Sequence, residues 1–216
     1  MIIRRSRPFT KVRIFELYMM MTTKIIAFAL LGIFYAAYFG KKAVQRRQGI
    51  QTNQIGVGSK PKRVLRIERL MGAATLLVVP VEVLSIVVFP QWTLIPQLRD
   101  CPALQWAGLL IAATGVVFFI TAMLTMADSW RAGIPEKDKT QLVQTGIYRI
   151  SRNPAFVGFD LVYIGLLIAF PNLLHLVFAL FPVVMLHLQI LQEEPYCRAT
   201  FGAPYEAYCK KVRRYL

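Results

Sequence analysis

Charged residues are scarce in this 216-residue chain: Asp, Glu, Lys and Arg make up 17% of it, against about 25% in typical soluble domains. Cysteine and histidine are scarcer still, at three and two residues, and no two cysteines form a CxxC pair. Neither a disulfide framework nor a zinc site is indicated, and we expect no metal site. The GxGxxG motif of dinucleotide-binding domains is also missing. This composition excludes a soluble globular enzyme, a disordered chain and a fibrous protein.

Long apolar runs take the place of the missing charge, and hydrophobic residues make up 56% of the chain. A helix needs about 20 mostly apolar residues to cross the hydrocarbon core of a membrane. Five runs approach or exceed that length: 15–39, 70–89, 102–127, 155–170 and 173–191. The predicted fold class is therefore all-α, a polytopic membrane helix bundle of about five transmembrane helices. It ends in a C-terminal helical hairpin and a cytoplasmic C-terminal segment.

The predicted hairpin follows from the connection between the last two runs, which consists only of Pro171 and Asn172. Proline stops a helix and asparagine tolerates a turn, so the two helices are expected to lie antiparallel. The organisation that we predict has three parts. They are a basic N-terminal segment 1–14, a region 15–127 with three transmembrane helices and a basic cytoplasmic loop 41–69, and a cofactor-binding region 128–216 that contains the hairpin 155–191.

Basic residues outnumber acidic ones by 26 to 11, which gives a net charge of +15. Nineteen of the 26 fall in segments 41–69, 128–154 and 192–216, which five spans place on one side of the membrane. The positive-inside rule assigns that side, and the C-terminus, to the cytoplasm. There the basic residues would meet anionic lipid headgroups, so we expect membrane lipids and no nucleic acid as partners.

The basic segment 1–14 does not follow this rule, because the same topology places it on the opposite side. It is predicted either to form an interfacial amphipathic segment or to precede a true start at Met21, just before the apolar run. Both readings stay open.

Two acidic residues, Glu82 and Asp160, fall in the interior of predicted spans, away from their ends. Ionisable groups are costly within a membrane and often mark function. Each is interpreted either as a functional group or as a structural partner of a neighbouring helix.

A denser polar cluster is predicted around the last hairpin. The hairpin returns Glu193 and Glu194 to the surface that carries Arg152, Asn153 and Pro154. Donors and carboxylates that meet in this way suit a zwitterionic ligand. The same residues are equally compatible with interfacial salt bridges that have no ligand.

A series of motifs runs through the C-terminal third of the chain from Thr140 onward. They are Leu142-Val143, Gly146-x-Tyr148, Arg152-Asn153-Pro154-x-Phe156-x-Gly158, Glu193-Glu194 and Phe201-Gly202-x-x-Tyr205-x-x-Tyr208, preceded by Trp130-Arg131-x-Gly133. Together they resemble the isoprenylcysteine carboxyl methyltransferase family, within a group of integral-membrane methyltransferases that includes phospholipid N-methyltransferases. The N-terminal half is similar to the family only in having helices.

The resemblance implies S-adenosylmethionine as cofactor, bound without a Rossmann domain. The cofactor-binding residues that it implies are Thr140, Gln141, Leu142, Val143, Tyr148, Arg152, Asn153, Pro154, Ala155, Phe156 and Glu193. It also implies a lipophilic small-molecule or lipid acceptor, methylated on a carboxyl oxygen, a nitrogen or a sulfur. Such nucleophiles need no strong base, so no catalytic acid or base is assigned. Because the smaller prokaryotic members have five spans, we expect a bacterial cell membrane.

The chain departs from the family at three positions. Asn153 stands where a His is usual, and Phe156 where a Tyr is usual. Gln189 occupies the position of a substrate-side Arg, and we assign it to substrate binding. A glutamine has no charge with which to fix a substrate carboxylate, which disfavours a prenylcysteine as the acceptor.

Two other classes compete with a methyltransferase. Membrane reductases of the sterol-reductase type carry a similar Arg-His-Pro signature and bind NADPH, but they follow it with polar residues that are absent from Ala155 to Phe159. A non-catalytic membrane scaffold is the second alternative.

Overall fold

A computed structural model describes residues 8–93, 101–134 and 141–216, with side chains for all of these except 8–13 and 15. The described chain folds into six α-helices and two short 3₁₀ turns. The helices are α1 (Pro8–Arg47), α2 (Lys62–Val88), α4 (Pro102–Met126), α5 (Pro154–Ala169), α6 (Leu173–Phe201) and α7 (Ala203–Lys211), and the turns are η1 (Ala127–Ser129) and η2 (Gly146–Arg149). The described residues form no strand, only an isolated bridge between Asn53 and Ala132. The all-α class is confirmed.

Four helices, α1, α2, α4 and α6, are long and apolar enough to cross a membrane. The fourth predicted span is shorter than this: α5 has 16 residues, which at 1.5 Å per residue is about 24 Å. Pro154 at its start and Phe170-Pro171-Asn172 at its end confine it. Asn172 then begins α6 by accepting a hydrogen bond from His175 N at 2.8 Å. The predicted hairpin is therefore present, with one short arm.

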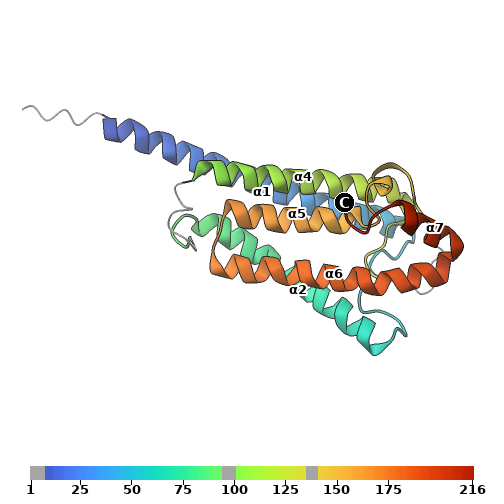
Figure 1. Ribbon diagram of the computed structural model, residues 1–216. Coiled ribbons are helices and arrows are strands. Elements are labelled where there is room, and N and C mark those ends of the chain that lie inside the picture. The colour runs from blue at the N-terminus through green and yellow to red at the C-terminus, as the bar shows by residue number, and fades with distance from the viewer. Residues whose placement is uncertain (1–7, 94–100, 135–140) are drawn as a thin grey trace, which may run out of the picture.

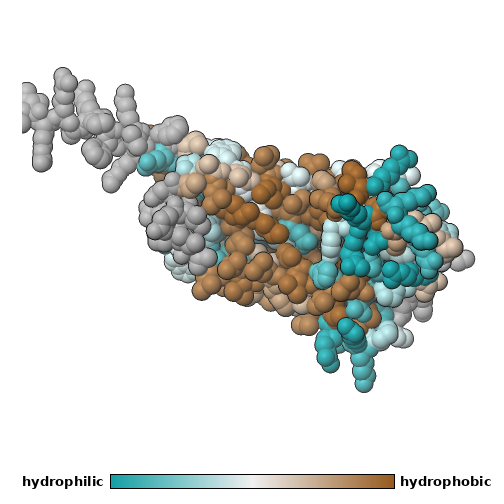
Figure 2. Space-filling model, in the orientation of Figure 1, coloured by the Kyte–Doolittle hydropathy of each residue, from teal (hydrophilic) through white to brown (hydrophobic). Residues whose placement is uncertain are grey.

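The helices form an elongated bundle in which α1, α4, α5 and α6 run along the long axis and α2 packs obliquely against α6 (Figure 1). α7, both 3₁₀ turns and the C-terminus lie together at one end. Apolar residues cover the middle of the bundle, and hydrophilic residues gather at that same end (Figure 2). Leu76 and Leu110 leave 72% and 69% of their area uncovered. Apolar exposure on this scale is typical of a lipid-facing surface.

Backbone contact between glycines holds α4 and α5 together. A Cβ added at Gly108 would lie 2.5 Å from Gly165 O, and one added at Gly115 would lie 2.7 Å from Gly158 O. Small residues let helix backbones approach closely within a membrane, where van der Waals packing drives association. The short helix α5 is thereby fixed along its whole length against α4.

A buried ion pair organises the loops at the polar end. Glu68 is fully buried, and its two carboxylate oxygens lie 2.8 and 2.9 Å from Lys60 Nζ. The same carboxylate accepts hydrogen bonds from Gly56 N at 2.7 Å and Ile134 N at 3.1 Å, while Lys60 Nζ also donates to Gln54 O. The charge and the lone pairs of the Glu68 carboxylate are therefore satisfied. Through these contacts the ion pair joins the 41–69 connection to the segment after α4.

Replacing Gly158 with Ala is expected to lower the stability of the bundle. The new Cβ would lie 2.7 Å from Phe119 N and 2.9 Å from Gly115 O, both rigid backbone atoms. Overpacking of this kind costs about 1–3 kcal/mol. The measurement is the thermal unfolding midpoint in detergent, with Gly32→Ala as the matched control, since a Cβ at Gly32 meets nothing within 4 Å. Equal midpoints for the two variants would contradict the assigned contact.

Candidate functional site

A cavity of about 760 Å³ extends from the polar end of the molecule into the bundle. Its walls come from α1, α2, α5 and α6, and its polar end is closed by η2, α7 and the segment around Trp130. The volume falls within the range of about 300–1,000 Å³ that is usual for small-molecule sites. One continuous space therefore joins the polar end of the protein to membrane depth.

The residues predicted to bind a cofactor gather on this cavity. Those that line it are Gln141, Leu142, Val143, Tyr148, Arg152, Asn153, Pro154, Ala155, Phe156 and Glu193. Thr140 lies outside the described residues. Segment 141–156 leads into the hairpin and segment 193–194 follows it in sequence, and residues of both line the same cavity.

Gln189, predicted on the substrate side, lies behind Glu193 and is not among the residues that line the cavity. It is fully buried, and its Nε2 donates to Glu193 Oε1 at 2.9 Å, one helical turn further along α6. Gln189 Oε1 has no hydrogen-bond partner within the described residues. The amide therefore orients the Glu193 carboxylate, and its substrate role stays a prediction.

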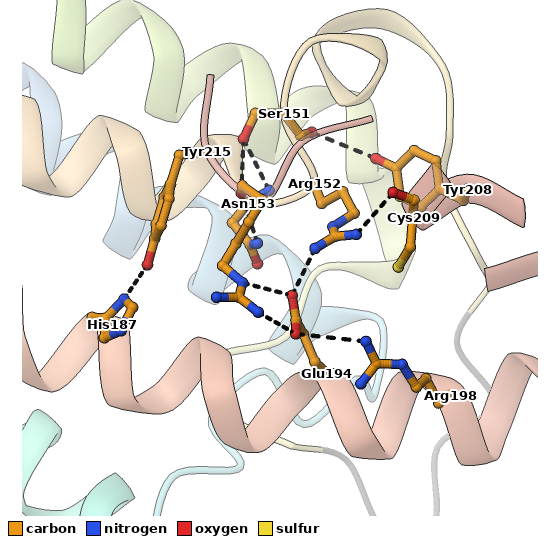
Figure 3. A network of polar contacts seen from close by, with 10 residues as sticks. Ser151, Arg152, Asn153, His187, Glu194, Arg198, Tyr208, Cys209 and Tyr215 are labelled. Carbon is orange, nitrogen blue, oxygen red and sulfur yellow. Dashed lines mark hydrogen bonds and ion pairs between the residues drawn. The ribbon is translucent and has the colours of Figure 1, made fainter. Parts of the chain in front are cut away.

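Glu194, next to Glu193 but on another face of α6, is the centre of an ion-pair network (Figure 3). Arg152 Nη2 donates to its Oε1 at 2.8 Å, and Arg214 donates to both of its oxygens at 2.8 Å. Arg198, on the exposed side, is more distant at 3.9 Å. Of the two interpretations of the polar cluster, interfacial salt bridges describe Glu194, although this residue also lines the cavity, while Glu193 lines the cavity with Gln189 as its hydrogen-bond partner.

The last residues of the chain bind the loop that begins α5. Arg152 N donates to Arg213 O at 3.0 Å, and Asn153 Nδ2 donates to Arg214 O at 2.9 Å. The Tyr215 hydroxyl pairs with His187 Nδ1 on α6 (Figure 3). The backbone carbonyls of Arg213 and Arg214 thus fix Arg152 and Asn153 at the rim of the cavity, and the Tyr215 side chain ties the same segment to α6.

Two tyrosines support the floor of the polar end. Tyr208 Oη on α7 donates to Tyr148 O at 2.6 Å and so holds η2 in place. Burial, with contributions from Tyr208 and Glu193, raises the pKa of Tyr148 well above its ordinary value. Burial also raises the pKa of Tyr208 to about 12, although Arg152 opposes the shift. Both phenols therefore stay neutral at physiological pH and act as hydrogen-bonding groups, not as bases.

Sequence reasoning missed the part played by Arg214. Its guanidinium binds Glu194 bidentately, and this hydrogen bonding raises the Arg214 pKa further. The sequence showed only a basic C-terminal stretch, in which Arg213 and Arg214 are indistinguishable. Nothing in the spacing indicated which arginine turns toward α6.

The fold and the cavity define a helical membrane protein with a chamber of small-molecule size at its polar end. Comparison with known proteins then shows what this chain is similar to. Residues 103–204 match the family model described as phospholipid methyltransferase. Two rice proteins, from Oryza sativa subsp. indica and subsp. japonica, are each described as a "Probable protein-S-isoprenylcysteine O-methyltransferase". Each is 30% identical to this chain over 122 residues.

These matches confirm the resemblance to the isoprenylcysteine carboxyl methyltransferase family, in the wider group that includes phospholipid methyltransferases. The alignment covers 55% of this chain and 64% of each rice protein, which is less than two thirds of the length of these relatives. No solved structure matches the chain significantly.

Replacing Glu194 with Gln is expected to destabilise the polar end strongly. Arg152, whose side chain is only 10% exposed, would lose its carboxylate partner. Removal of one partner of a buried ion pair costs about 3–5 kcal/mol. The control is Arg198→Gln, at the long and exposed contact, for which we expect a loss of stability of less than about 1 kcal/mol. Denaturant titrations measure the free energy of unfolding of both variants. Similar losses in both variants would contradict the central role of Arg152 and Arg214.

Proposed function

We propose that this protein is an integral-membrane methyltransferase that uses S-adenosylmethionine to methylate a lipophilic acceptor reached from the bilayer. One observation carries the proposal. A single cavity is lined both by the residues that the family resemblance assigns to the cofactor and by side chains at membrane depth on α1, α2 and α5. The names of the rice relatives support the same reaction class.

The residues at the polar end fit the chemistry of this cofactor. A zwitterionic ligand needs an acceptor for its amino group and donors for its carboxylate. Glu193 supplies the acceptor, and Arg152, whose buried Nε has no hydrogen-bond partner within the described residues, supplies a donor. The rings of Tyr148 and Phe156 line the same space and offer π-faces to a sulfonium, which is a diffuse cation. When bound, S-adenosylmethionine supplies the activated methyl group.

The contribution of the protein to rate is alignment and exclusion of water. Gln189 and the Glu194 network fix the carboxylate and the guanidinium before any ligand binds. Apolar side chains form most of the deeper wall, so the reacting groups are removed from water. An ionised carboxylate, a neutral amine or a thiol needs no strong base in such a site. We accordingly assign no catalytic acid or base.

The proposed acceptor is lipophilic because the cavity continues between apolar helices. A prenylcysteine carboxylate, which the names of the rice relatives indicate for those proteins, is disfavoured here. Gln189 is uncharged, buried and already bonded to Glu193. We propose that the polar end lies in the cytoplasm, as the positive-inside rule predicts.

Replacing Glu193 with Gln is expected to weaken S-adenosylmethionine binding by about 10- to 100-fold. The substitution keeps the shape of the side chain but removes a charged hydrogen bond, which contributes about 1.5–3 kcal/mol. The affinity of the purified protein in detergent is measured by isothermal titration. The matched control is Glu206→Gln, an exposed acid on α7, which leaves the affinity unchanged. Unchanged affinity in the Glu193 variant would refute the site.

Incubation of membranes containing the protein with methyl-labelled S-adenosylmethionine is expected to label a lipid extract and not a soluble extract. The reason is that the cavity reaches membrane depth through apolar walls. A parallel thermal shift compares S-adenosylmethionine with NADPH, and only the former should raise the unfolding midpoint. Stabilisation by NADPH alone would favour the reductase alternative, and no response to either would favour a scaffold.

A further inference from the structure

The membrane-depth part of the cavity carries a second polar site, formed by Tyr35 of α1, Glu82 of α2 and Tyr163 of α5. We call these three residues the deep polar cluster. Tyr35 Oη donates to Glu82 Oε2 at 3.3 Å. Glu82 and Tyr163 are both fully buried. Three of the helices that form the cavity, α1, α2 and α5, therefore each contribute one polar group to the same place.

The cluster is incompletely satisfied. Glu82 Oε1 is buried without a hydrogen-bond partner among the described residues, and the buried Tyr163 hydroxyl lies near Tyr35 but forms no hydrogen bond of good geometry with it. No Lys or Arg in the described part of the chain forms an ion pair with Glu82. The Glu68 carboxylate, by contrast, is buried with its partners in place. Buried polar groups without partners are costly in a membrane and point to a ligand that completes them.

The two tyrosines of the cluster line the cavity. Glu82 is not itself a lining residue, but Val79 and Pro80, three and two residues before it on α2, are. Pro80 has no N–H, so the carbonyl of Leu76, a residue of the cavity wall, lacks its usual helical donor.

The cluster is distant from the proposed methyl-transfer site. Tyr163 follows Pro154 by nine residues on α5, and at 1.5 Å per residue the two are separated by about 14 Å along the helix axis. One ligand that occupies both places therefore has two polar groups separated by an apolar stretch.

We propose that the deep polar cluster binds a hydroxyl or amine group carried on the apolar body of the methyl acceptor. Such groups both donate and accept hydrogen bonds, as a carboxyl and a phenol beside each other require. A plain hydrocarbon chain, such as a prenyl group, would leave the cluster unpaired. The acceptor is therefore an amphiphile with two polar ends. This inference rests on the proposed function only in treating the lipophilic ligand as the methyl acceptor.

A purely structural role for the cluster makes a different prediction. If the three side chains only tie α1, α2 and α5 together, then removing a hydroxyl changes stability and leaves ligand preference as it was. Ligand preference is therefore the quantity that separates the two roles.

The test measures the Kd of two probes, dodecan-1-ol and dodecane-1,12-diol, for the full-length protein in one detergent. For each protein variant, the ratio of the two Kd values gives the preference for the second hydroxyl. Comparing this ratio between variants cancels the difference in how the probes partition into micelles. In Tyr163→Phe the preference for the diol is expected to fall about fivefold relative to the wild type, equivalent to one net hydrogen bond of about 1 kcal/mol.

Tyr38→Phe is the matched control, because it removes a hydroxyl from the same cavity wall without a hydrogen bond to Glu82. Its diol preference is expected to equal that of the wild type. Glu82→Leu serves as a second variant, since replacing a buried acid by an apolar residue of similar size is compatible with folding. It too is expected to lose the preference. An unchanged preference in Tyr163→Phe or in Glu82→Leu would overturn the proposal.

Titration of S-adenosylmethionine into the same proteins separates this inference from the proposed function. All four proteins are expected to bind it equally, because the cluster lies away from Glu193 and Arg152. If the wild type fails to bind S-adenosylmethionine but still prefers the diol, the methyltransferase proposal fails and the polar ligand site stands.

Discussion

The polar end of this protein depends on one carboxylate that two arginines from different segments bind at the same time. Glu194 accepts hydrogen bonds from Arg152 at the start of α5 and from Arg214 near the end of the chain. These three residues join a loop, a membrane helix and the C-terminal segment, and hydrogen bonds from Arg152 N to Arg213 O and from Asn153 Nδ2 to Arg214 O support the same junction. The contact also distinguishes two adjacent acids: both line the cavity, but Glu194 is neutralised by arginines, whereas Glu193 accepts a hydrogen bond from the uncharged amide of Gln189.

A second constraint acts within the apolar part of the bundle. The glycines of α4 and α5 bring the two backbones so close that no side chain fits between them. The cavity therefore lies on the other side of α5, between it and helices α1, α2 and α6. Pro154 begins α5 at the polar end, so the position of Arg152 and Asn153 follows from the packing of this helix. The site is thus positioned by backbone contact in the membrane and by ion pairs above it.

Much of this could be predicted from sequence, because it rests on local patterns. Apolar runs and the Pro171-Asn172 connection predicted the helices and the hairpin, and the hairpin predicted that residues near 152 and 193 meet. Distant pairing could not be predicted. The choice of Arg214 over Arg213 depends on how the final segment turns, and the pairing of Lys60 with Glu68 depends on the path of a loop. The short length of α5 was visible only as an apolar run of marginal length.

The part played by Arg214 also fixes the order in which the molecule is completed. A chain is synthesised from its N-terminus, and its earlier parts fold first. Helices α1 to α5 are therefore made while Arg152 still has no carboxylate beside it, and Glu194 is made before Arg214. The rim of the cavity closes only after Arg214 has been added to the chain. A ribosome that stalls between Glu194 and Arg214 would leave the described membrane helices around an unfinished cavity.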